Sequence, residues 1–283
     1  MSMTIKEIQA IELALFKWFH KFCVEKQLRY YMSGGTLLGA VRHQGFIPWD
    51  DDIDVHMPRK DFNKFLAEAG KIPVFLTLGF LDHPATYPYD FGKLASTRTL
   101  VKEKYMPGHK MGIYLDIFPI DGVPEDKEVQ HRLEQEELKL AKQLEYHYFI
   151  PKGIMHPKSK LEVWFKQILY GRSKGLSPKL YREKYDELLQ FDFDKSLRVK
   201  NFTCYGKNEK ENIPQTYYGK PTLMIFADTR FYGMEQADLY LKHFYGDYLQ
   251  LPSMEKRHGH DMEATYLPGW DLAKILEEFS KYV

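Results

Sequence analysis

Two aspartates, Asp52 and Asp54, alternate with the apolar residues Ile53 and Val55 in the stretch "DIDV". In a strand, alternate side chains share one face, so both carboxylates would point the same way, with their Cα atoms roughly 6.6 Å apart. Two carboxylates on one half-buried face repel each other strongly, and a divalent cation bound between them removes that repulsion. Ligands that are all oxygen favour Mg²⁺ or Mn²⁺ over zinc. The pattern therefore predicts a metal site.

Asp50 and Asp51 precede this pair directly, so four aspartates fall within five positions. The plainer interpretation is a solvated acidic turn, with Asp50 and Asp51 as turn or cap residues. For Asp50 and Asp51, a solvated turn and a functional site are equally good interpretations. The solvated turn suits Asp52 and Asp54 less well, because they alternate with apolar residues.

A glycine pair lies upstream of the acidic stretch, in the tetrapeptide Ser33, Gly34, Gly35 and Thr36. Glycine permits unusual backbone angles and the close approach of a ligand. The start of the helix that follows offers free N–H groups and a partial positive charge, which suit a phosphate, and the two hydroxyls can donate. The alternative is a tight turn with Thr36 as a helix cap. A phosphate cradle beside paired carboxylates is typical of a metal-dependent phosphoryl or nucleotidyl transferase.

The elements around these residues predict an α+β or α/β chain with a helical excursion in the middle. Hydrophobic spacing predicts an amphipathic first helix, and Pro58 is expected to open another helix. A helix beginning near Met234 is expected to be the last, before a tail with Pro, Gly and His. A turn leading into a short helix is expected over 33–43. The other expected helices cover 4–27, 58–69, 127–149, 161–171, 181–191 and 234–246, and the expected strands 28–32, 52–58, 73–79, 89–95, 112–118, 199–205 and 221–227.

Composition narrows the functional classes. The 283 residues can bury a substantial core, and a net charge of +1 argues against a dedicated nucleic-acid binder. There are only two cysteines, Cys23 and Cys204, without a metal-like spacing, which favours a reduced, cytoplasmic protein. No signal-peptide core or apolar run long enough to span a bilayer is present. A membrane substrate would therefore be approached from the side.

A family resemblance enters with these motifs. A glycine pair followed by "DIDV" resembles the nucleotidyltransferase pattern shared with DNA polymerase β. The longer block "GGTLLGAVRHQGFIPWDDDIDVHMPR" is similar to the LicD family of bacterial phosphotransferases, itself related to fukutin and fukutin-related protein. Segments 91–101, 112–121 and 240–261 resemble further family blocks. The resemblance implies one domain over 1–283, with a polymerase-β-like core sheet and flanking helices at about 1–124 and 199–283 and a helical insertion at about 125–198.

The resemblance also implies an activity. It implies Mg²⁺ (or Mn²⁺) and transfer of phosphocholine from CDP-choline to a sugar hydroxyl of a lipid-linked glycan precursor of teichoic acid or lipopolysaccharide, with release of CMP. The protein would work in the cytoplasm, at times on the inner face of the membrane through peripheral contact. Alternatives are CDP-ribitol or CDP-glycerol as donor, and a non-catalytic protein that binds glycan phosphates. A glycosyltransferase with a DxD motif is disfavoured by "SGGT".

Carried over to this sequence, the resemblance places the metal carboxylates at Asp52 and Asp54. Asp116, in "YLDIF", is the best candidate for a third carboxylate, as metal ligand or general base. Asp121 is either that third acid or a turn residue. Lys93 is expected to neutralise the donor phosphate.

The remaining substrate-binding candidates are basic or aromatic. Arg42 can clamp a phosphate or pair with an aspartate, and Arg98 is a weaker candidate. Arg257 and His258 form a basic cluster with His260, which is a binding site or a flexible tail. A choline-facing aromatic side chain is sought among Trp49, Tyr87, Tyr89, Tyr105 and Tyr114.

Overall fold

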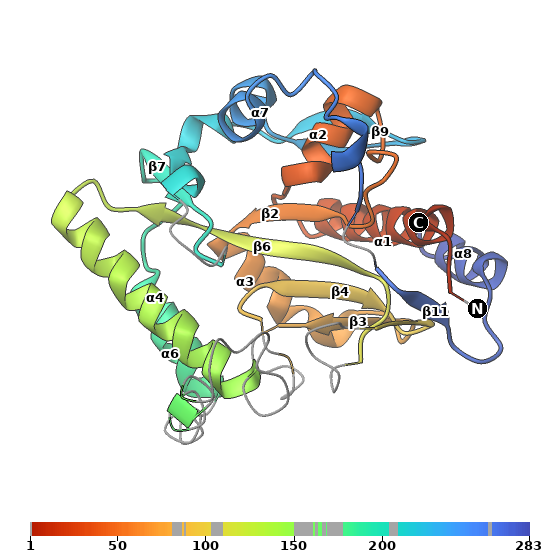
Figure 1. Cartoon of the computed structure of the whole chain (residues 1–283), viewed down its shortest axis with the longest axis horizontal. Coiled ribbons are helices and arrows are strands. Elements are labelled where there is room, and N and C mark those ends of the chain that lie inside the picture. The colour runs from red at the N-terminus through yellow and green to blue at the C-terminus, as the bar shows by residue number, and fades with distance from the viewer. Residues whose placement is uncertain are drawn as a thin grey trace.

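Five strands form the main path of a mixed sheet, in the order β1-β2-β6-β4-β3 (Figure 1). Two further strands, β7 and β8, extend it from the far end of β6, which makes seven strands in all. Strands β2 and β6 are parallel, and the other pairs on the path are antiparallel. This computed structural model describes residues 2–80, 87, 89–102, 110–149, 161, 164–165, 168, 178–203, 209–259 and 262–283.

The strands of this sheet are short except for β6. Their bounds are β1 (Tyr31–Met32), β2 (Asp54–Pro58), β3 (Leu76–Gly79), β4 (Gly92–Ser96), β6 (Tyr114–Val123), β7 (Arg198–Lys200) and β8 (Ile213–Pro214). Two small antiparallel pairs lie outside it, namely β5 (Thr99–Val101) with β11 (Ala264–Tyr266), and β9 (Thr222–Phe226) with β10 (Thr229–Gly233).

The described helices surround the sheet on several sides. They are α1 (Ile5–Glu25), α2 (Gly34–His43), α3 (Arg59–Ala67), α4 (Lys127–Phe149), α6 (Pro178–Leu188), α7 (Ala237–Tyr245) and α8 (Leu272–Ser280), with 3₁₀ turns at Ala69–Lys71, Glu209–Glu211, Gln215–Tyr217 and Met254–Lys256. In Figure 1, α4 and α6 run together along one side, within the range predicted for a helical insertion. Within the part of the chain that is described, no helix is both long and apolar enough to cross a membrane.

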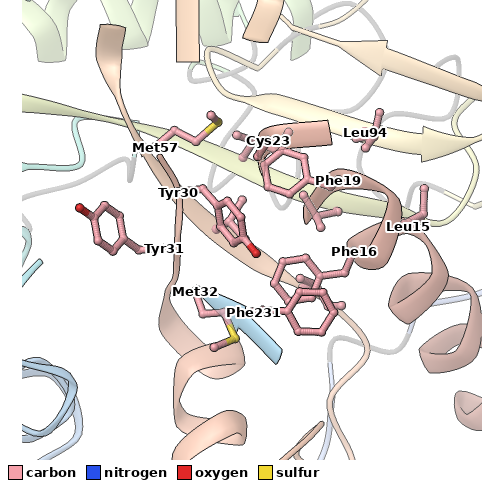
Figure 2. Close-up of a cluster of buried hydrophobic side chains, with 14 of the residues drawn as sticks. Leu15, Phe16, Phe19, Cys23, Tyr30, Tyr31, Met32, Met57, Leu94 and Phe231 are labelled. Atoms are coloured by element: carbon pink, nitrogen blue, oxygen red, sulfur yellow. The ribbon is translucent and has the colours of Figure 1, made fainter. Parts of the chain in front are cut away.

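Helix α1 begins at a capping box and buries one face against the sheet. The backbone N–H of Thr4 donates to Glu7, and the Glu7 N–H donates back to the Thr4 hydroxyl. Figure 2 shows Phe16 and Phe19 of α1 in the buried cluster that also contains Leu94 of the sheet. This layer of aromatic and aliphatic side chains fixes the sheet from one side.

Strand register separates the two faces of the sheet. Val55, Ile117 and Leu94 are fully buried in the core cluster with α1. The residues of opposite parity form a row, because Asp54 is paired with Asp116, and Asp116 with Lys93. Since paired residues on neighbouring strands share a face, these three charged side chains lie together on the face away from the core.

The sequence predicted much of this architecture, and the mixed α+β class is confirmed. Four predictions were wrong. Asp52 lies just before β2, which begins at Asp54. Asp121 is a fully buried strand residue paired with Lys200, so its interpretation as a turn residue fails. The helix near Met234 begins only at Ala237, and it is not the last, because the Asp271 side chain caps α8 by accepting from the Lys274 N–H.

Candidate functional site

The central feature of the site is a buried ion pair next to a second carboxylate. The Lys93 ammonium donates to both carboxylate oxygens of Asp116, at 2.6 and 2.9 Å. Asp54 lies on the adjacent strand, and burial raises its pKa well above the ordinary aspartate value. The charges of Asp52 and Asp116 raise that pKa further, while Lys93 opposes them. The site therefore holds more negative charge than its one lysine neutralises.

The start of α2 lies directly against these carboxylates. Gly34 has φ +51°, and a Cβ on it would lie 3.3 Å from Oδ2 of Asp54. A Cβ on Gly35 would lie 2.6 Å from Oδ2 of Asp50, so the Asp50 side chain would have to move. The backbone angle favours glycine at position 34, and Gly35 lets the Asp50 carboxylate approach the helix start closely. The positive end of the helix faces the acidic group.

Ser33 and Thr36 flank the glycines and tie α2 to β2. The Thr36 hydroxyl accepts from the Asp54 N–H at 2.8 Å, and the Ser33 N–H donates to the Asp54 carbonyl at 3.1 Å. Within the described residues the buried Ser33 hydroxyl has no hydrogen-bond partner. Such a group is rare in native proteins and is commonly satisfied by water, an ion or a ligand.

Three aromatic rings enclose the Lys93 ammonium. Its distances to the ring centroids are 3.4 Å for Tyr114, 5.3 Å for Phe91 and 5.5 Å for Tyr89. Two choline-facing candidates, Tyr89 and Tyr114, therefore surround a cation that the chain itself supplies. Tyr87 is fully buried and donates to the Phe91 carbonyl. Tyr105 lies outside the described residues.

The carboxylates fit a hard divalent cation in their chemistry. Their oxygens are the ligands that Mg²⁺ and Mn²⁺ prefer. Burial and then the charges of Asp52 and Asp116 raise the pKa of Asp54, and a bound cation would oppose both effects. No group of three or more His, Cys, Asp or Glu side chains already converges on one point among the residues described. Asp52 and Asp54 would hold the ion, and Asp116 would join them only by releasing Lys93.

The two other acids of the stretch differ from each other in position. The Asp51 carboxylate is buried and accepts from the Met262 N–H at 2.8 Å, which fastens the C-terminal segment to the acidic stretch. The Asp50 side chain lies against Gly35, and its carbonyl accepts from Gln9 of α1 at 2.8 Å. Asp51 therefore has a structural contact, whereas Asp50 belongs to the site.

Two sequence candidates form ion pairs elsewhere. Arg98 donates to both carboxylate oxygens of Glu278 in α8, at 2.9 and 2.8 Å, and stacks on Trp270. Asp121 accepts a bidentate pair from Arg59, at 2.8 and 2.6 Å. Both contacts hold the fold together, so we leave these residues out of the proposed site.

Arg42 and Arg257 are linked through the Trp49 ring, which lies 5.5 Å from the Arg257 guanidinium and 6.4 Å from the ring of His43, the neighbour of Arg42. Arg42 donates to the His43 ring and to the Tyr248 carbonyl, so its predicted pairing with an aspartate is not formed. Arg257 donates to the Pro252 carbonyl at 2.9 Å. The Arg257 charge, after burial, lowers the pKa of Arg42. His258 is exposed, and His260 lies outside the described residues.

Two tyrosines of α7 lie at the site, and no pattern in the sequence predicted them. The Gly34 N–H donates to the Tyr240 hydroxyl at 3.3 Å. The Tyr245 hydroxyl would lie 3.9 Å from a Cβ on Gly34. Burial raises the pKa of Tyr245, and Asp54 makes the largest charge contribution to that rise. The tyrosines therefore close the site opposite the sheet.

Glu12 of α1 is a further acid that we did not predict. It is fully buried, and among the described residues neither of its carboxylate oxygens has a hydrogen-bond partner. Burial raises its pKa well above the ordinary glutamate value, and Asp52 makes the next largest contribution. A signal was present in the sequence, because Glu12 falls on the apolar stripe of the helix, four residues after Ile8 and three before Leu15.

We expect Glu12→Gln to change how stability depends on pH. A pKa raised in the folded state stabilises the protein at pH below the unfolded-state pKa, and this contribution is lost as pH rises toward the folded-state pKa. The variant should therefore gain in unfolding free energy relative to the native protein as pH rises, by about 1–3 kcal/mol near neutral pH without metal. Urea unfolding over a pH series measures this difference.

Glu7→Gln is the matched control on the same helix. Its pKa is lowered by the capping hydrogen bonds, so the stability it contributes is present above its unfolded-state pKa and is lost on acidification. This variant should lose stability relative to the native protein as pH rises, opposite to Glu12→Gln. Parallel curves for Glu12→Gln and the native protein would contradict the assignment of an unpaired buried acid.

Comparison with known proteins identifies the family of the chain. Residues 27–168 match the family model described as LicD/FKTN/FKRP, nucleotidyltransferase domain. The chain is 28% identical over 274 residues to the lipopolysaccharide cholinephosphotransferase LicD of Haemophilus influenzae, covering 94% of this chain and 98% of that protein. It is 43% identical over 49 residues to the ribitol 5-phosphate transferase FKRP of Homo sapiens, covering 16% of this chain and 10% of the relative.

Proposed function

The chain belongs to the LicD/FKTN/FKRP nucleotidyltransferase-domain family, and on that premise we propose that it transfers phosphocholine from CDP-choline to a sugar hydroxyl of a lipid-linked glycan precursor. The products are a phosphocholine-substituted glycan of the teichoic acid or lipopolysaccharide type and CMP. The relative aligned over nearly the whole chain is named a cholinephosphotransferase, which supports a phosphotransferase role on a glycan.

One observation carries the proposal, namely the row of Asp54, Asp116 and Lys93 that faces the glycine start of α2. A phosphate approaching Gly34 and Gly35 would meet the Asp54 and Asp50 carboxylates first. Anion would then face anion, unless a cation lies between them. Clustered acids beside a glycine helix start are thus suited to metal-assisted phosphoryl transfer and unsuited to simple phosphate binding.

A Mg²⁺ or Mn²⁺ ion held by Asp52 and Asp54 would supply charge neutralisation for the donor diphosphate. The glycines keep side chains out of the space that the diphosphate needs. The acceptor hydroxyl oxygen attacks the phosphorus that bears choline, its proton passes to Asp116, and the bond to the CMP oxygen breaks. Lys93, already at hydrogen-bond distance from Asp116, orients that carboxylate for the proton.

One observation favours a second candidate for the group that is transferred. The rings of Tyr89, Phe91 and Tyr114 enclose Lys93, so this set of rings already holds a cation. A neutral alditol phosphate needs no aromatic cage, and one relative is named a ribitol 5-phosphate transferase. CDP-ribitol or CDP-glycerol is therefore the alternative donor, with the same transfer chemistry.

The test is a donor screen with CMP release as readout. The protein is incubated with Mg²⁺, a crude lipid-linked glycan fraction and, separately, CDP-choline, CDP-ribitol, CDP-glycerol or sugar nucleotides. We expect acceptor-dependent CMP release from CDP-choline that chelation of the metal abolishes. Release from another CDP-alcohol changes the cargo alone, whereas turnover of a sugar nucleotide only, or of no donor, contradicts the proposed chemistry.

A further inference from the structure

Two arginines lie together without a carboxylate partner among the described residues. Arg42 bonds to the His43 ring at 3.0 Å and the Tyr248 carbonyl at 2.8 Å, and Arg257 bonds to the Pro252 carbonyl at 2.9 Å. A guanidinium has five N–H donors, so each retains donors beyond these bonds. The Arg257 guanidinium lies 5.5 Å from the centroid of the Trp49 ring, and the His43 ring, to which Arg42 donates, lies 6.4 Å from the same ring. The pair is thus a positive site that an anion would stabilise.

The segment 248–254, whose carbonyls accept hydrogen bonds from both arginines, also exposes large apolar side chains. Its carbonyls at Tyr248 and Pro252 are the ones that Arg42 and Arg257 bind. Between and beside these two positions, Leu249 is 64%, Leu251 45% and Met254 73% exposed. Phosphate-binding donors among exposed aliphatic side chains match the two layers of a bilayer surface, in which phosphates lie above acyl chains.

This segment is close to the candidate active site. It follows α7, whose Tyr245 lies beside Gly34 and is affected by the Asp54 charge. In Figure 1 the chain passes from α7 across the side of the molecule where α2 lies, before it returns toward β11. A surface on that side would bring a membrane-borne acceptor close to the start of α2 and the carboxylates beside it.

We infer that Arg42, Arg257, Leu249, Leu251 and Met254 form a membrane-docking surface that binds the phosphate groups of an anionic bilayer. The inference rests on the proposed function in one respect, because a lipid-linked acceptor gives such docking its purpose. The arginines bind lipid phosphates and the aliphatic side chains enter the interface. The donor diphosphate is a poorer occupant, because it would lie at the glycines and carboxylates.

The test measures binding to vesicles of phosphatidylcholine alone and of phosphatidylcholine with phosphatidylglycerol, by sedimentation, without any donor. We expect binding to the anionic vesicles that falls as salt rises. Arg257→Gln should weaken it about fivefold, since one basic residue near such a surface contributes about 1 kcal/mol. Leu249→Ser/Met254→Ser should weaken it about tenfold. Unchanged binding by both variants overturns the inference.

Matched variants test whether exposed apolar residues elsewhere on the protein bind the vesicles. Val74→Ser is the control for an exposed aliphatic residue elsewhere, since Val74 is 86% exposed, and it should bind as the native protein does. Trp164→Ser/Phe165→Ser tests another exposed apolar pair, and loss of binding in this variant alone places docking at these two residues and overturns the inference.

Two further readouts test the identity of the ligand. The first readout is binding of glucose 1-phosphate. If Arg257→Gln abolishes this binding while Leu249→Ser/Met254→Ser leaves vesicle binding unchanged, the arginines form a site for a free phosphate and the inference is overturned. A change of oligomeric state in Leu249→Ser/Met254→Ser, seen by analytical ultracentrifugation, indicates a second copy as the occupant and also overturns it. Because the vesicle assay contains no donor, docking can hold even if the donor screen fails.

Discussion

Asp54→Asn is expected to reduce acceptor-dependent CMP release by about 10³-fold or more, equivalent to at least about 4 kcal/mol of transition-state stabilisation. The Asp54 carboxylate lies at the start of α2, where Oδ2 is 3.3 Å from the position of a Cβ on Gly34. Asp54 is also paired with Asp116 on the neighbouring strand. Asparagine keeps the shape and removes the charge, so the loss measures the electrostatic contribution. Steady-state rates at saturating donor and Mg²⁺ are the measurement.

The same variant should keep or gain stability although it is inactive. The Asp54 pKa is raised in the folded state, so the stability that Asp54 contributes is fully present below its unfolded-state pKa and is lost as pH rises toward the folded-state pKa. Asparagine cannot ionise, and its thermal midpoint at neutral pH without metal should equal or exceed that of the native protein. A variant that is both inactive and unstable would indicate a folding defect instead of a lost catalytic charge.

Asp228→Asn is the control for this substitution. Asp228 lies at the turn between β9 and β10 and pairs with Lys17 on the surface, where such pairs contribute at most about 1 kcal/mol. Its CMP release should match that of the native protein. If Asp54→Asn keeps activity within about tenfold of that control, the carboxylate is not a metal ligand of the transfer reaction.

Local patterns predicted the elements, and pairing between distant segments completed the site. Alternation of Asp52 to Val55 predicted which side chains face the core, and the burial of Ile53 and Val55 agrees with it. The alignment of Asp54 with Asp116 depends on β2 and β6 pairing in parallel in one register, and no short-range pattern encodes that. The same limit applies to Arg42 and Arg257, which are adjacent only because the chain returns over α2 after α7.

Other features that we did not predict were nevertheless indicated by the sequence. Leu272, Ile275, Leu276 and Phe279 have helical spacing after Asp271, a favourable cap, so α8 was predictable. Glu12 on an apolar stripe was an equally plain anomaly. The role of Lys93 was less accessible, because a lysine in a strand gives no indication of whether its partner is a phosphate or a carboxylate of the protein itself.

Lys93→Met is expected to lower the free energy of unfolding strongly. The substitution leaves the Asp116 carboxylate buried beside Asp54 without its cation, and removing one partner of a buried ion pair costs about 3–5 kcal/mol. The loss should be greatest where both aspartates are ionised and should shrink on acidification, as protonation relieves their repulsion. Urea unfolding at neutral and at acidic pH measures it.

The double variant Lys93→Met/Asp116→Asn separates stability from chemistry. It removes both charges of the pair, so its unfolding free energy at neutral pH should return to within about 1 kcal/mol of the native protein, since no charge is left uncompensated. CMP release should stay low, because the proton acceptor and its cation are both gone. If Lys93→Met alone is as stable as the native protein at neutral pH, the Lys93–Asp116 pair does not hold the site together. If the double variant turns over donor normally, the proposed proton transfer to Asp116 is wrong.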